Sequence, residues 1–174
     1  MPIKALDVLL TAWRDLIAGG SLSPDEDRLI VIGDGPLRQR LAMESRTDEL
    51  RGTVRVLGPL PQAEIAGWMR AASVLCLSSR HEGMPNVVVE ALASGLPVVA
   101  TAVGGIPDLV KPPLNGYLAV PGNSREFAAA LAQAFTRNWD AGQIAATASG
   151  YNWRDLATRN LEVLTSAAGL TTTN

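Results

Sequence analysis

The sequence predicts an α/β domain built on a doubly wound, parallel sheet. Short apolar runs rich in β-branched residues alternate along the chain with segments whose apolar residues recur at helical spacing. Strands separated by single helices pair in parallel through right-handed crossovers. Hydrophobic residues make up 47% of the 174 residues, and charged residues only 18%. The charged share lies below the roughly 25% of an average soluble domain, which indicates that both faces of the sheet are buried.

The first half of the chain contains two predicted strands. It opens with an amphipathic helix whose inward face comprises Leu6, Leu9, Leu10, Trp13 and Ile17. A buried strand follows at 28–33, and a Gly-Asp-Gly-Pro turn leads into a helix that runs from Pro36 to about Met43. A second strand at 54–58 and a helix at 62–71 complete this half.

The second half continues the same alternation. Its predicted elements, in chain order, are strand 73–78, helix 86–94, strand 96–101, a short helix within 104–110, strand 116–120 and helices from 124, 141–148 and 153–168. Ser124 is the predicted N-cap of its helix. The sequence shows no repeat and no linker, so we expect one domain over residues 1–168 and a frayed tail over 169–174.

The order of elements predicts that the first strand of the sheet is missing. A strand should precede the first helix of this architecture, yet helical spacing begins almost at Met1. We therefore expect a fragment. The first strand of a doubly wound sheet is usually central, so its loss should leave backbone groups unpaired and favour association.

Composition excludes several classes of function. The formal net charge of −2 offers no electrostatic footprint for nucleic acid. One cysteine, Cys76, excludes an internal disulfide, fits a reducing compartment and is predicted to be a core residue. No apolar run approaches the roughly 20 residues of a membrane span, so we expect a cytoplasmic domain, while peripheral attachment to a membrane stays open.

The loop after the third predicted strand has the strongest chemical content. Ligands of open α/β sheets bind beyond the carboxyl ends of the strands. Gly83 removes a side chain where a ligand must approach the backbone, and Asn86 is the predicted N-cap of a helix whose amides suit a phosphate. Glu82 lies on the loop and Glu90 in the first turn of that helix, so the two carboxylates could hold two parts of one extended ligand.

The residues alone leave other interpretations open. A glutamate near a helix start is stabilised by the helix dipole, and this effect alone could explain Glu90. Glu82 could be a solvated loop residue. Two carboxylates could also form a glycosidase pair, although nothing else in the sequence supports a hydrolase. His81, the only histidine, could contact a substrate beside Glu82.

Longer motifs carry a resemblance to a known family. The stretch SRHEGMPNVVVEALASGLPVVATAVGGIPDLV, with VIGDGPLRQRL before it and NGYLAVPGN after it, resembles the C-terminal domain of family 4 glycosyltransferases. These are two-domain retaining enzymes of the GT-B type, whose C-terminal domain is Rossmann-like and binds the donor. The resemblance covers the chain from KALDVLLTAW to the helix after Ser124.

The resemblance implies roles for individual residues. Glu90 matches the glutamate that grips the ribose of the donor nucleotide, and Glu82 matches the catalytically important glutamate near the transferred sugar. Lys4 matches a lysine that neutralises the diphosphate, while its usual arginine companion has no counterpart in this sequence. The loop whose backbone holds the sugar and the diphosphate corresponds to Gly83, Met84, Pro85, Asn86 and Val87.

The resemblance also implies a reaction and partners. The donor would be a UDP-sugar or GDP-sugar, and its sugar would pass to an acceptor hydroxyl with retained configuration. No His, Cys or carboxylate cluster in the sequence has metal-ligand spacing, so no metal is expected, and no cofactor is expected either. The acceptor site of the family lies in an N-terminal domain, so this chain alone is expected to be inactive. Two alternatives are a nucleotide-binding or partner-binding remnant without turnover and a fragment of a GT-B-type nucleotide-sugar epimerase.

Overall fold

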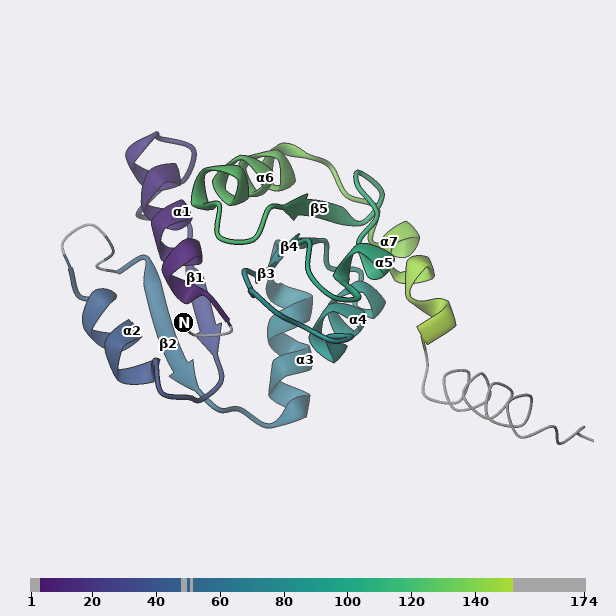
Figure 1. Ribbon diagram of the computed structural model, residues 1–174, viewed down its shortest axis with the longest axis horizontal. Helices are drawn as coiled ribbons and strands as arrows, with labels where there is room; N and C mark the ends of the chain where they lie inside the picture. Colours follow the sequence, from purple (N-terminus) through teal and green to yellow (C-terminus); the bar gives the residue numbers. More distant parts are fainter. Residues whose placement is uncertain (1–3, 48–49, 51, 152–174) are drawn as a thin grey trace, which may run out of the picture.

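The computed structural model describes residues 4–47, 50 and 52–151 (Figure 1). In chain order the elements are α1 (Leu6–Ala18), β1 (Leu29–Ile32), α2 (Arg38–Glu44), β2 (Val54–Gly58), α3 (Gln62–Ala71), β3 (Leu75–Leu77), α4 (Asn86–Ala93), β4 (Val98–Thr101), α5 (Ile106–Leu109), β5 (Gly116–Ala119), α6 (Ser124–Thr136), α7 (Ala141–Thr147) and the 3₁₀ turn η1 (Ser149–Tyr151). The predicted helix 153–168 and the tail 169–174 lie outside the described residues. The predicted alternation of strands and helices is confirmed.

All described strand pairs are parallel, and they form two sheets. β1 pairs with β2, while β3, β4 and β5 form a second sheet with β4 in the centre. In the usual strand order of a doubly wound sheet, 3-2-1-4-5-6, the first strand lies between the second and the fourth. β1 and β3, which would correspond to the second and fourth strands of that order, are not paired with each other.

Helices cover both faces of the β3–β4–β5 sheet. On one face α1 and α6 pack against each other, and Trp13 and Phe127 are buried in a core that takes strand residues from both sheets, including Val54 of β2 and Val99 of β4. On the other face α4, α5 and α7 surround a second core, which alternate residues of β4 enter. This arrangement confirms the predicted doubly wound architecture.

The burial of the strands reflects whether each has a paired strand on both sides or on one side only. All four residues of β4, which has a strand on each side, are buried. Only Leu29 of the four β1 residues is buried, and the three β3 residues are half-buried. Cys76 of β3, which was predicted to be buried in the core, is half-buried and packs against the α1–α6 core, and burial raises the pKa of its thiol to about 12. Among the described residues, no helix combines the length and the apolar character needed to cross a membrane.

The broken sheet predicts self-association. Strands with unpaired N–H and C=O groups beside apolar side chains are templates for pairing with another chain. We expect the isolated chain to associate reversibly with rising concentration, which sedimentation velocity measures. A monodisperse monomer at high concentration, together with a cooperative thermal melt, would contradict this expectation.

Two helices start at the predicted residue, but the predicted N-cap of each is wrong by one residue. Asn123, not Ser124, caps α6, because the Asn123 side chain accepts a hydrogen bond from the backbone N–H of Glu126 at 3.1 Å. In α4 the residue before the helix is Pro85, so Asn86 is the first helical residue and not the cap. No side-chain cap hydrogen bond is present at the start of α4.

Candidate functional site

Two loops at the carboxyl ends of β3 and β4 form the frame of the site. The β3 loop carries Glu82 and Gly83, and the turn after β4 contains Gly104 and Gly105. The backbone N–H of Gly105 donates to the carbonyl of Gly83 at 2.8 Å. Gly104 has φ +54°, and a Cβ there would overlap the carbonyl oxygen of Glu82. The backbone of the Glu82 loop therefore packs in direct contact with the turn that contains Gly104 and Gly105.

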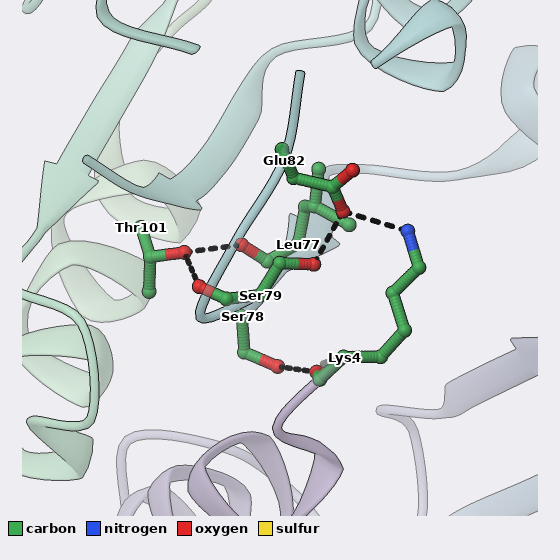
Figure 2. A network of polar contacts seen from close by, with 6 residues as sticks. All are labelled: Lys4, Leu77, Ser78, Ser79, Glu82 and Thr101. Carbon is green, nitrogen blue, oxygen red and sulfur yellow. Dashed lines mark hydrogen bonds and ion pairs between the residues drawn. The ribbon is translucent and has the colours of Figure 1, made fainter. Parts of the chain in front are cut away.

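The Glu82 carboxylate is held by two side chains (Figure 2). Lys4 Nζ and Ser79 Oγ both lie 2.6 Å from Glu82 Oε1. The Glu82 side chain is 12% exposed and the Lys4 side chain is 56% exposed. The ion pair thus joins a mostly buried carboxylate to a lysine whose side chain is largely exposed. The two residues are 78 positions apart in the sequence.

Buried hydroxyl groups fix the main chain around this ion pair. Ser78 Oγ donates to the carbonyl of Lys4 at 3.0 Å and to that of Ala5 at 3.1 Å. Thr101 Oγ1, at the end of β4, donates to the carbonyl of Ser79. Both Ser79 and Thr101 are fully buried. The start of α1, the end of β3 and the end of β4 are therefore joined by hydrogen bonds at one place.

Opposing influences act on the charge of Glu82. Burial, the largest of them, disfavours the carboxylate. Hydrogen bonds from Lys4 and Ser79, together with the positive charge of Lys4, outweigh burial and hold the pKa of Glu82 below its usual value. Glu82 is therefore a carboxylate at neutral pH, which suits it to accept hydrogen bonds or to stabilise positive charge, and not to donate a proton.

The position of Glu90 differs from the prediction. Glu90 is the fifth residue of α4 and so lies in its second turn, not in the first, because the helix begins at Asn86. Its side chain is half-buried and forms no hydrogen bond or ion pair with the residues that the structure describes. A dipole contact at the helix start therefore does not account for Glu90, since the dipole effect is confined to the first turn.

The structure brings some of the predicted residues together and leaves others apart. Lys4 and Glu82 are in contact, and Gly83 is bonded to the glycine turn after β4. Along the rest of the loop Met84 and Asn86 are exposed, whereas Pro85 is buried and Val87 packs against the core beneath α4. No contact joins Glu82 to Glu90 among the described residues, so their joint use of one ligand stays a prediction.

Sequence reasoning missed the residues that support Glu82. Ser79 lies three positions before Glu82, and a polar pair at the end of a buried strand is the only local signal for it. Thr101 and Gly104 belong to the next strand and its turn, so their contacts with the Glu82 loop appear only once the fold is formed.

Comparison with known proteins identifies the family. The family model described as "Glycosyl transferases group 1" matches residues 1–137. This chain belongs to the group 1 glycosyl transferases. The resemblance to the C-terminal domain of family 4, GT-B-type enzymes is thereby confirmed at the level of family and fold.

Curated relatives within the group 1 glycosyl transferases are longer than this chain. The D-inositol 3-phosphate glycosyltransferase of Streptomyces griseus is 36% identical over 180 residues, which cover 95% of this chain and 37% of that protein. The enzyme of the same name from Thermobispora bispora is 35% identical over 95% of this chain and 41% of that protein. The chain therefore spans about two fifths of the length of these relatives.

Solved structures of similar proteins agree with the fold. A glycosyltransferase from Rickettsia africae aligns with a TM-score of 0.81 over 95% of this chain and 45% of that chain, at 17% identity, which supports the fold alone. Anabaena HepE in complex with UDP-glucose aligns with a TM-score of 0.71 at 26% identity, over 98% of this chain and 46% of that chain.

Proposed function

We propose that this chain is the donor-binding domain of a retaining glycosyltransferase, and that it binds a nucleoside diphosphate sugar at the loops after β3 and β4. The observation that carries the proposal is the Lys4–Glu82 ion pair at the carboxyl ends of two parallel strands, next to the loop that leads into α4. Parallel sheets bind ligands at this edge. The complex of HepE with UDP-glucose supports UDP-glucose as the first donor to test.

Each part of the site matches one part of such a donor. Lys4 and the backbone amides of Asn86 and Val87, at the start of α4, offer positive charge to a diphosphate. We expect the ionised Glu82 to lie beside the transferred sugar. The carboxylate of Glu90, which has no hydrogen-bond or ion-pair partner among the described residues, suits the two hydroxyls of a ribose. Residues 83–87 connect these two glutamates along the chain, and we propose that their backbone contacts the sugar and the diphosphate.

The proposed reaction transfers the sugar to an acceptor hydroxyl with retained configuration. The bond from the sugar to the diphosphate breaks, and negative charge develops on the leaving diphosphate. Fixed positive charge and oriented amides lower the barrier because they are in place before this charge develops. Two curated relatives are named for D-inositol 3-phosphate, and we propose that acceptor binding belongs to the longer protein. The chain alone is therefore expected not to catalyse transfer.

Calorimetry tests the proposal. The isolated chain is titrated with UDP-, GDP- and ADP-glucose and with the corresponding nucleotides, and binding selective for one base is the expected result. Absence of binding to any nucleotide would overturn the proposal and favour a remnant without donor affinity. A separate assay for donor hydrolysis and transfer is expected to show no turnover, and robust transfer would refute the proposed need for the rest of the protein.

A further inference from the structure

We propose that Ser79 is a positioning residue for Glu82 and keeps its carboxylate in place when Lys4 turns to a bound diphosphate. This inference rests on the proposed function, because it requires a donor whose diphosphate recruits Lys4. It concerns a residue that neither the sequence motifs nor the family resemblance singled out. Its basis is the difference between the two groups that hold Glu82.

Both contacts of the carboxylate end on the same oxygen. Lys4 and Ser79 each approach Oε1 to 2.6 Å, and Oε2 accepts no hydrogen bond from the residues that the structure describes. An ionised carboxylate has acceptor capacity on both oxygens. Oε2 is therefore the atom available to a hydroxyl of the donor sugar, and the contacts on Oε1 determine where Oε2 points.

The two contacts on Oε1 differ in how firmly they are held. Lys4 is a long side chain, 56% exposed, and a diphosphate offers it more negative charge than one carboxylate does. Ser79 is fully buried, and Thr101 holds its main-chain carbonyl from the neighbouring strand. When Lys4 shifts to the diphosphate, the neutral hydroxyl of Ser79 remains on Oε1 and keeps the carboxylate oriented.

The adjacent serine provides a contrast within the same strand end. Ser78 is also buried, at 2% exposure, but its hydroxyl donates to the carbonyls of Lys4 and Ala5 and not to Glu82. Ser78 thus fixes the main chain that carries Lys4, whereas Ser79 fixes the carboxylate. The two serines hold the two sides of the ion pair separately, and Ser78→Ala is the matched control for Ser79→Ala.

The experiment combines a carboxyl titration with calorimetry. The pKa of Glu82 is followed by carbon-13 NMR in the wild-type chain, Ser79→Ala, Ser78→Ala and Lys4→Met, and UDP and UDP-glucose are titrated into each. In Ser79→Ala we expect the pKa of Glu82 to rise and UDP-glucose affinity to fall about tenfold, with UDP affinity changed less than about twofold. In Lys4→Met we expect UDP affinity to fall as well.

The outcomes separate this inference from the proposed function. If the wild-type chain binds neither UDP nor UDP-glucose, the proposed function fails. If it binds both, but Ser79→Ala leaves the pKa of Glu82 and the preference for UDP-glucose over UDP unchanged, the inference about Ser79 fails alone. An equal loss in Ser78→Ala of UDP-glucose affinity alone, with UDP affinity unchanged, would also overturn it, because Ser78 supports Lys4 and a loss through Lys4 should lower UDP affinity as well.

Discussion

Gly104→Ala is expected to lower the free energy of unfolding by about 2–5 kcal/mol, which combines a backbone cost and a steric cost. Gly104 has φ +54°, and a residue with a Cβ pays about 1–2 kcal/mol in this left-handed region. The added Cβ would also overlap the carbonyl oxygen of Glu82, and such overpacking costs about 1–3 kcal/mol. Because that oxygen belongs to the site loop, UDP-glucose affinity should fall together with stability.

Gly20→Ala is the matched control for this prediction. Gly20 has φ +69°, but a Cβ there meets nothing within 4 Å. Its substitution should therefore cost only the backbone strain of about 1–2 kcal/mol and leave UDP-glucose affinity unchanged. Urea denaturation measures both free energies of unfolding. Equal losses in the two variants would show that the glycine turn does not support the Glu82 loop.

The succession of elements could be predicted from hydrophobic periodicity. Periodicity predicts β2 and α3 with the bounds that the structure shows, because each combines a strong apolar pattern with clear flanking turns. Periodicity predicted one doubly wound sheet, and it gave no sign that the described strands form two separate sheets, β1–β2 and β3–β4–β5. Periodicity does not identify the capping residue, because neighbouring polar residues such as Asn123 and Ser124 can both cap a helix, and here Asn123 does.

The candidate site could be predicted only in part. The resemblance pointed to Lys4 and Glu82, and the structure shows that they are in contact although 78 positions separate them. The hydroxyl of Ser79 and the glycine turn at Gly104 act on Glu82 through contacts between neighbouring strand ends. Periodicity describes which face of an element is buried, and it contains no information on which loops meet at the sheet edge.

Glu90→Ala is expected to weaken nucleotide binding about 100-fold or more, and this prediction rests on the proposed function. A carboxylate that accepts hydrogen bonds from both hydroxyls of a ribose contributes about 1.5–3 kcal/mol for each charged bond, and every 1.4 kcal/mol is tenfold in affinity. Glu90→Gln keeps the shape but loses the charge, so its loss should be smaller, about tenfold. Titration of UDP into each variant measures these losses.

Stability distinguishes a binding role of Glu90 from a structural one. The Glu90 side chain has no hydrogen-bond or ion-pair partner among the described residues, and alanine favours a helix at least as well as glutamate. Glu90→Ala should therefore keep the free energy of unfolding of the wild-type chain while it loses UDP. Glu64→Ala, in the exposed first turn of α3, is the control and should change neither property. Wild-type UDP affinity in Glu90→Ala would refute the proposed role of this carboxylate in donor binding.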